Sequence, residues 1–304
     1  MERRRIGSLD VSVVGLGCNN FGSRIDEART AEVLDAALEA GINLLDTADI
    51  YGGTRSETFI GRFLESRRDE VVIATKFGME RQPHVPGGAS PAYVRAAVDA
   101  SLSRLRTDRI DLYQLHEPRP ETPIADTLGA LDQLVRDGKV REIGCSNFTA
   151  EQLREARDAA PGARFVSVQN ELNLLERADV DDGLAEAARQ GLAYLPYFPL
   201  ASGRLTGKYR RGSVAPKGSR LAGWYDDDER AEALSDAVFD RVESLERFAS
   251  DRHHTLLELA FAWLLAHEAV ASVIAGATSA EQVRSNVAAA SWRLSRDDLA
   301  ALDA

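Results

Sequence analysis

Short apolar runs alternate along the chain with longer segments in which apolar residues recur every three or four positions. The short runs predict buried strands, and the periodic segments predict amphipathic helices. A hairpin is expected over residues 5–14, with its turn at 7–10. A short strand and a glycine-rich loop are expected within residues 15–21, and further strands at 43–46, 71–76, 110–116, 142–146, 165–169, 192–197 and 271–275. Helices are expected at residues 27–40, 55–67, 91–105, 124–137, 150–159 and 180–190, within 229–250, and at 255–267, 279–290 and 295–302.

The alternation of strands and helices predicts a parallel sheet. Eight strand and helix units in 304 residues favour an α/β fold of one domain, residues 1–304: a (β/α)8 TIM barrel whose bottom is closed by the N-terminal β-hairpin. A doubly wound sheet is the alternative, but it would usually open its first helix with a GxGxxG turn. The spacing of Gly15, Gly17 and Gly22 is too irregular for that motif.

Composition and charge exclude several classes of function. No segment approaches 18 consecutive apolar residues, so no membrane span is expected. The basic residues 1–5 are followed by polar positions rather than by the apolar core of a secretory signal, so the expected location is cytoplasmic. A net charge of -11 argues against nucleic-acid binding. No exposed apolar stripe is evident, and a monomer is expected.

The two cysteines, Cys18 and Cys145, form neither a CxxC motif nor a Cys/His cluster. They suggest no disulfide framework and no zinc site, and both are expected to be reduced core residues. No metal site is expected.

Candidate chemistry begins at residues 41–53, GINLLDTADIYGG, where a short apolar strand runs into Asp46 and Tyr51 follows five residues later. Alone, this stretch could hold only a turn cap and a rim tyrosine. However, Lys76 and His116 end the next two predicted strands. Parallel barrel strands deliver their C-terminal ends to one face, so these four groups are expected to form an acid/base set.

The chemistry of this set favours proton transfer. A phenol has a reference pKa near 10, which a nearby ammonium such as Lys76 should lower. Asp46 would keep Lys76 protonated, and His116 could donate a hydrogen bond to the oxygen that Tyr51 protonates. The set offers no activated nucleophile, so the other half of the reaction would have to come from a cofactor.

Seven stretches carry a resemblance to the aldo-keto reductase family, in that family's order and across nearly the whole chain. They are DTADIYG at 46–52, ATKFG at 74–78, DLYQLHEP at 111–118, GCSNF at 144–148, VQNELN at 168–173, PYFPLASGRLTGKY at 196–209 and GATSAEQVRSN at 276–286. The resemblance implies a catalytic tetrad of Asp46, Tyr51, Lys76 and His116. It implies reversible NAD(P)H-dependent reduction of an aldehyde or ketone, with Tyr51 as general acid.

The resemblance also implies a set of cofactor-binding residues. Ser146, Asn147 and Gln169 would hydrogen-bond the nicotinamide carboxamide, with the Tyr197 ring stacked on the nicotinamide. Leu200, Ser202, Gly203 and Lys208 would line the pyrophosphate path, and Gly276, Thr278, Gln282 and Asn286 would surround the adenosine end. Asn20 is a further candidate, as a cofactor contact and pocket wall. Individually, Ser146 and Asn147 could cap a helix, and Gln169 could be a satisfied core amide.

Three departures from the family's pattern bear on the cofactor and the pocket. Residues 276–279 hold no Lys or Arg for the 2′-phosphate of NADPH, so NADP(H) is expected but NAD(H) stays open; Arg284 or another loop cation would supply the charge. Arg204 stands where an apolar residue is usual and is expected to be a surface residue or a phosphate contact. The chain closes after one short helix, without the long C-terminal loop of the steroid-reducing branch, so an open pocket is expected.

The basic segment 201–228 contains Lys208, Arg210, Arg211, Lys217 and Arg220. It is expected to cross the bound cofactor, with its cations facing the phosphates, and to be mobile without cofactor. A solvated basic loop is the alternative. Candidate pocket walls, which could equally be packing residues, are Asn20, Phe77, Trp224 and Tyr225. Expected surface histidines are His84, His253, His254 and His267.

Two other functions stay open. One is a nucleotide-binding redox sensor, like the channel-associated β subunits of the family, and the intact tetrad argues against it. The other is a lyase or isomerase barrel without nicotinamide, which the cofactor motifs weaken. Fold alone does not decide among them.

Overall fold

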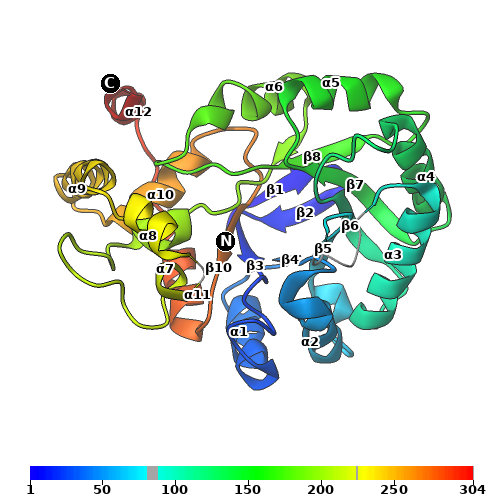
Figure 1. Ribbon diagram of the computed structural model, residues 1–304, viewed down its shortest axis with the longest axis horizontal. Helices are drawn as coiled ribbons and strands as arrows, with labels where there is room; N and C mark the ends of the chain where they lie inside the picture. Colours follow the sequence, from blue (N-terminus) through cyan, green and yellow to red (C-terminus); the bar gives the residue numbers. More distant parts are fainter. Residues whose placement is uncertain (81–87, 224, 304) are drawn as a thin grey trace.

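A closed ring of parallel strands surrounded by helices forms the body of the protein (Figure 1). The computed structural model describes residues 1–80, 88–223 and 225–303. The ring follows the order β10-β3-β4-β5-β6-β7-β8-β9, and every neighbouring pair is parallel. Its strands are β3 (Val14–Gly17), β4 (Leu44–Asp46), β5 (Val72–Phe77), β6 (Ile110–Leu115), β7 (Val140–Ser146), β8 (Phe165–Gln169), β9 (Ala193–Tyr194) and β10 (Val273–Gly276).

Backbone hydrogen bonds next to β9 and β10 close the ring. The amide of Ala271 donates to the carbonyl of Tyr194 at 3.0 Å, and the amide of Ile274 donates to that of Pro196 at 3.4 Å. The prediction of a (β/α)8 barrel is confirmed.

Helices cover the outside of the ring (Figure 1). They are α1 (Glu27–Glu39), α2 (Arg55–Phe63), α3 (Pro91–Leu105), α4 (Ile124–Arg136), α5 (Ala150–Ala159), α6 (Gly183–Gln190), α7 (Arg220–Gly223), α8 (Asp227–Ala233), α9 (Asp236–Ser250), α10 (Leu256–Leu265), α11 (Ala280–Ala289) and α12 (Arg296–Asp303). Short 3-10 segments are η1 (Tyr51–Thr54), η2 (Arg68–Glu70), η3 (Ala178–Val180) and η4 (Ala201–Thr206). None of the helices in the described residues is long and apolar enough to cross a bilayer.

Local sequence explains where several helices begin. Thr149 with Gln152, Asp226 with Glu229, and Thr255 with Glu258 form reciprocal capping boxes at α5, α8 and α10. Pro91 opens α3 behind the Ser90 cap, where a missing amide hydrogen costs nothing. At α3 and α5, which follow β5 and β7, these signals fix where the connection at the barrel mouth ends.

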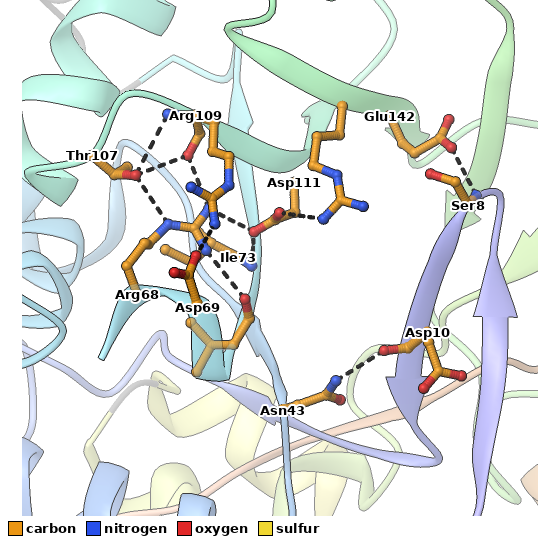
Figure 2. Close-up of polar contacts among 12 residues, drawn as sticks. Ser8, Asp10, Asn43, Arg68, Asp69, Ile73, Thr107, Arg109, Asp111 and Glu142 are labelled. Atoms are coloured by element: carbon orange, nitrogen blue, oxygen red, sulfur yellow. Dashed lines mark hydrogen bonds and ion pairs between the residues drawn. The ribbon is translucent and has the colours of Figure 1, made fainter. Parts of the chain in front are cut away.

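The N-terminal hairpin, β1 (Arg3–Ile6) with β2 (Leu9–Ser12), closes the end of the barrel where the strands begin. Its buried Ile6, Leu9 and Val11 pack in one cluster with the barrel residues Leu44 and Leu112. Polar contacts fix the hairpin there, as Figure 2 shows: Asn43 Nδ2 donates to the carbonyl of Asp10 at 2.9 Å, and the amide of Ser8 donates to Glu142 at 2.7 Å.

The same end of the barrel holds a buried charge network (Figure 2). Asp111, near the start of β6, is 1% exposed and accepts from Arg68 at 2.6 Å and from the amide of Ile73 at 2.9 Å. Arg141 of β7 donates to its other oxygen at 3.1 Å. The carboxylate therefore ties β5, β6 and β7 together at the end opposite the strand termini that carry the candidate tetrad.

Candidate active site

A cavity of about 870 Å³ opens at the C-terminal ends of the barrel strands. All the predicted cofactor residues line it: Asn20, Ser146, Asn147, Gln169, Tyr197, Leu200, Ser202, Gly203, Lys208, Gly276, Thr278, Gln282 and Asn286. Asp46, Tyr51 and His116 line it as well, whereas the fully buried Lys76 lies behind them. The barrel thus brings the residues predicted from distant stretches to a single cavity.

The ammonium of Lys76 is the centre of the expected tetrad. Its Nζ donates to both carboxylate oxygens of Asp46, at 2.8 and 2.7 Å, and to the Tyr51 hydroxyl at 3.3 Å. A further hydrogen bond, of 3.1 Å, goes to the carbonyl of Thr47. These contacts satisfy the ammonium in a fully buried position, where an unpaired charge would be very costly.

The pKa of Lys76 reflects these neighbours. Burial alone would lower it, but Asp46 and Tyr51 more than offset burial, and the pKa of the ammonium lies above its ordinary value. Burial raises the pKa of Tyr51 above 10, and Lys76 only partly opposes this effect. Lys76 thus lowers the pKa of the phenol as expected, but burial outweighs this effect and leaves the pKa above its usual value. Tyr51 instead holds its proton at neutral pH, with an ammonium beside the oxygen to stabilise phenolate as it forms.

The turn after Tyr51 fits against the loop between β3 and α1. Gly52, with φ of 58°, lies so close that a Cβ there would overlap the carbonyl oxygen of Phe21. Neighbouring Gly53 has φ of 66° and no atom within 4 Å of such a Cβ. Gly52 is thus needed both for its backbone conformation and for this close approach.

His116, the fourth member of the tetrad, follows β6 and contacts Tyr51. Its ring lies edge-on to that of Tyr51, with centroids 5.9 Å apart. Burial, Lys76 and Arg119 hold the pKa of His116 well below 6.5, so the imidazole is neutral at physiological pH. Its Nδ1 is buried and has no hydrogen-bond partner among the described residues. Asn147 Nδ2 donates a hydrogen bond to the backbone carbonyl of His116 at 2.9 Å.

The side chains expected around the nicotinamide carboxamide also bond to one another. Ser146 Oγ donates to the carbonyl of Gln169 at 2.7 Å, and Gln169 Nε2 donates to Asp46 Oδ1 at 2.9 Å. The hydroxyl of Tyr197 donates to Asn147 Oδ1 at 2.8 Å. The carboxamide site and the acid/base set therefore form one hydrogen-bonded unit, a link that the sequence did not predict.

A cluster of cations lines the other part of the cavity. Arg24, Lys208, Lys217 and Arg220 all face it, whereas Asp46 is the single acid among its described lining residues. Burial, together with Arg24 and Arg220, lowers the pKa of Lys208, as expected when like charges crowd one another. In a chain of net charge -11, this local concentration of positive charge fits the phosphates of a dinucleotide.

Other features also fit a dinucleotide. A Cβ on Gly203 would overlap Lys208 Nζ, so the glycine leaves room for this ammonium at the cavity wall. Tyr197, Asn147 and Gln169 line the same cavity, and Gln169 joins them to the tetrad through its hydrogen bond to Asp46. The described residues contain no cluster of His, Cys, Asp or Glu arranged to hold a metal ion.

Several predicted positions lie elsewhere. Phe77 is not a pocket wall, because it is fully buried and stacks on Tyr113 at 4.6 Å. Arg210 and Arg211 do not face the cavity but pair with acids of α9. Arg210 pairs with Glu246, and Arg211 pairs with Asp236, Asp240 and Glu243.

Arg284 is exposed on α11 and does not line the cavity, so it is not positioned as the missing phosphate cation. Arg204, also outside the lining, bonds the carbonyl of Ala201 at 2.9 Å. Tyr225 supports the wall indirectly, through a hydrogen bond of 2.9 Å with Ser202. The positions predicted at His84 and Trp224 lie outside the described residues.

Two of the histidines expected at the surface are half-buried instead. His254 stacks on Trp292 at 4.0 Å, and His267 lies edge-on to Trp263 at 5.1 Å. His253 is exposed. Cys145 is a buried core residue as predicted, and Cys18 is buried but also contributes to the cavity wall.

Sequence reasoning missed Arg24, Asn19, Met79, Phe198 and Ser285, all of which line the cavity. The signal for Arg24 was its place in the glycine-containing loop that follows the first barrel strand. Loops at this end of a barrel build the site, so any cation in them is a candidate.

Comparison with known proteins agrees with this geometry. The profile of the Aldo/keto reductase family matches residues 13–304. The NADP(+) aldo-keto reductase yakc of Schizosaccharomyces pombe is 34% identical over 306 residues, covering 96% of this chain and 87% of its own. A probable voltage-gated potassium channel subunit beta of Arabidopsis thaliana is 31% identical over 299 residues, covering 95% and 91%.

Among solved structures, that of the glycerol dehydrogenase AKR11B4 from Gluconobacter oxydans matches with a TM-score of 0.83 at 31% identity, covering 99% of this chain and 94% of that one. A TIM barrel with these residues at the C-terminal ends of its strands is the arrangement of the aldo-keto reductase class of oxidoreductases. The chain belongs to the aldo/keto reductase family, whose members use nicotinamide cofactors.

Proposed function

We propose that this protein reduces aldehydes or ketones to alcohols with NADP(H), and that Tyr51 is the general acid. The observation that carries the proposal is the Lys76 ammonium, which contacts both the Asp46 carboxylate and the Tyr51 hydroxyl beside the cavity. Reduction of a carbonyl requires a hydride at carbon and a proton at oxygen. When bound, the reduced nicotinamide supplies the hydride.

The chain's own residues would supply and stabilise the proton. Tyr51 gives its hydroxyl proton to the carbonyl oxygen, and Lys76 stabilises the phenolate left behind. Asp46 keeps Lys76 charged in its buried position. Neutral His116, beside the Tyr51 ring, orients the carbonyl through a hydrogen bond.

We assign the residues that line the cavity to different parts of the cofactor. Ser146, Asn147 and Gln169 would hold the carboxamide, and Tyr197 would stack on the nicotinamide. Lys208 and Arg220 would hold the pyrophosphate with the wall formed by Leu200, Ser202 and Gly203, while Asn20 borders it from the first loop. Gly276, Thr278, Gln282 and Asn286 would surround the adenosine.

NADP(H) is proposed over NAD(H) because the relative yakc is named for NADP(+). The four cations that line the cavity suit the pyrophosphate, which both nucleotides carry, and residues 276–279 contribute no cation for the 2′-phosphate. We further propose that the chain acts as a single domain and a monomer in the cytoplasm.

A second candidate function is a nucleotide-binding redox sensor with little turnover, because a channel β subunit is among the relatives. The two functions differ in turnover rather than in nucleotide binding. A sensor has no need of a proton donor held by a buried ion pair, which favours the enzyme.

The test is to titrate the purified protein with NADPH and with NADH, and then to assay a panel of carbonyls with wild type and Tyr51→Phe. We expect binding by both proteins and a loss of turnover of about a hundredfold or more in Tyr51→Phe, since a hundredfold is the lower end of the range for losing a general acid. Binding without turnover on the whole panel would favour the sensor. Absence of binding would refute both functions.

A further inference from the structure

The segment that joins β7 to α5 carries Asn147, one of the residues proposed to hold the carboxamide. Asn147 has φ of 61°, in the left-handed region that residues other than glycine seldom adopt. Its backbone amide donates to the carbonyl of Gln169 at 3.1 Å. Its side chain joins the carbonyl of His116 to the hydroxyl of Tyr197. The backbone conformation at Asn147 therefore determines how these groups meet beside the cavity.

Asn170, directly after β8, holds the residue that follows Asn147. Its Oδ1 accepts from the backbone amide of Phe148 at 3.2 Å, and its Nδ2 donates to the backbone carbonyl of Phe148 at 2.8 Å. The side-chain amide thus pairs with both polar groups of one residue, as a neighbouring strand would. Asn170 is 7% exposed and Phe148 is 3% exposed, so water has little access to this pair. Loss of the amide would leave two buried backbone groups in need of other partners.

The Asn170 amide is held in one orientation from its other side. Its Nδ2 also donates to Asp179 Oδ2 at 3.1 Å. That carboxylate accepts in addition from the hydroxyl of Tyr194 and, through Oδ1, from the amide of Gly183 at 3.2 Å. Both hydrogens of the Asn170 amide nitrogen thus have acceptors, and a reversed amide would turn its oxygen toward the Asp179 carboxylate.

The contact between Asn170 and Phe148 acts directly on Asn147. The amide of Phe148 belongs to the same peptide plane as the carbonyl of Asn147, so fixing this amide restrains the backbone of Asn147. Asn147 lines the cavity, whereas Asn170 is not among the described residues that do so. The Asn170 side chain can therefore influence a ligand only through its partners.

We propose that Asn170 is a positioning residue that keeps Asn147 in place for the nicotinamide end of the cofactor. The inference rests on the proposed function, which places the carboxamide against Ser146, Asn147 and Gln169. Because Asn170 acts through Asn147, its loss should weaken binding of the nicotinamide half of NADPH and leave binding of the remainder unchanged.

The test compares wild type, Asn170→Ala, Asn147→Ala and the double variant by calorimetric titration. The ligands are NADPH and 2′-phospho-ADP-ribose, which lacks only the nicotinamide. We expect Asn170→Ala to bind NADPH about tenfold more weakly, as for loss of a hydrogen bond, and to bind 2′-phospho-ADP-ribose as wild type does. In the Asn147→Ala background, Asn170→Ala should have no further effect, because residues that act through one another are not additive.

Asn43→Ala is the matched control. Asn43 is 8% exposed and also pairs through its side-chain amide with backbone groups, the amide of Ser12 at 2.7 Å and the carbonyl of Asp10 at 2.9 Å. These contacts lie at the opposite end of the barrel. Asn43→Ala should lower the melting temperature but leave the affinity for NADPH unchanged, which separates a loss of stability from a loss of position.

Asn170→Ser, whose short hydroxyl cannot pair with both groups of Phe148, takes the place of Asn170→Ala if that variant does not fold. Wild-type affinity for NADPH in the Asn170 variant would overturn the inference, as would equal weakening of both ligands or additive effects at Asn147 and Asn170. If wild type binds neither ligand, or if Asn147→Ala binds NADPH as wild type does, the proposed function fails at the carboxamide site and the inference falls with it.

Discussion

The Nζ of Lys76 lies 2.7 Å from Oδ2 of Asp46, with the lysine side chain fully buried and the aspartate side chain 4% exposed. Removing one partner of such a pair leaves the other charge buried and uncompensated. We therefore expect Lys76→Met to lose about 3–5 kcal/mol of unfolding free energy, measured by urea denaturation, and to lose turnover. The control is Lys139→Met, whose exposed pair with Asp99 should be worth less than about 1 kcal/mol.

The same pair predicts a dependence of stability on pH. The fold raises the pKa of Lys76, so its contribution is complete below the unfolded value of about 10.4 and declines as the pH rises through the higher folded value. The stability difference between wild type and Lys76→Met should close in that alkaline range. A difference that stays constant there would contradict the raised pKa.

Arg119 should help to keep His116 neutral. Burial is the largest cause of the lowered pKa of His116, and the Lys76 and Arg119 cations add to it. In Arg119→Met, the His116 ring should titrate at a higher pH than in wild type, though still below 6.5, as followed by NMR with His116→Gln for assignment. Glu117→Gln removes the acid that pairs with Arg119 at 2.8 Å but keeps the cation, so no upward shift is expected. An equal rise in both variants would refute the role of the Arg119 charge.

Two adjacent glycines offer a matched pair of substitutions. Gly52→Ala places a methyl group on the carbonyl of Phe21, so it should displace the Tyr51 turn and reduce both melting temperature and turnover sharply. Gly53→Ala meets no atom and should cost only about 1 kcal/mol for its left-handed conformation, with turnover retained. Similar behaviour of the two variants would show that the close approach at Gly52 does not matter.

Substitutions of Lys208 and Arg284 test which of these two cations contributes to cofactor binding. Lys208 lines the cavity beside Gly203, so Lys208→Met should weaken binding of NADPH and of NADH by about tenfold or more in fluorescence titrations. Arg284→Met should leave both affinities unchanged because Arg284 is exposed outside the cavity. A loss of NADPH binding alone in Arg284→Met would show that Arg284 is the cation for the 2′-phosphate after all.

Strand periodicity and strand order were enough to predict the barrel and to bring Asp46, Lys76 and His116 to one mouth. The same periodicity could have placed Phe77 correctly, because successive side chains of a strand point to opposite faces and Lys76 points inward. This rule favours packing, one of the two alternatives that the sequence left open for Phe77.

Contacts between loops could not be predicted in this way. Whether Arg211 faces a phosphate or α9 depends on which acids the folded segment 201–228 meets, and no local pattern encodes that. The loop position of Arg24 marked it as a candidate cavity residue, but its contact with Gly218 could not be predicted, since this partner lies 194 residues away. Likewise, the pKa of Tyr51 depends on burial as well as on Lys76, and only the folded structure gives the depth of burial.

The network around Asp111 and the hairpin contacts of Asn43 and Glu142 lie at the end of the barrel remote from the catalytic mouth. The contacts that join β5, β6, β7 and the hairpin at this end are thus separate from the cavity lining. Loops at the mouth can therefore be exchanged, in evolution or in the laboratory, without removing the contacts that keep the barrel closed. New substrate preferences can be sought there by loop grafting, while the hairpin and the Asp111 network are kept unchanged.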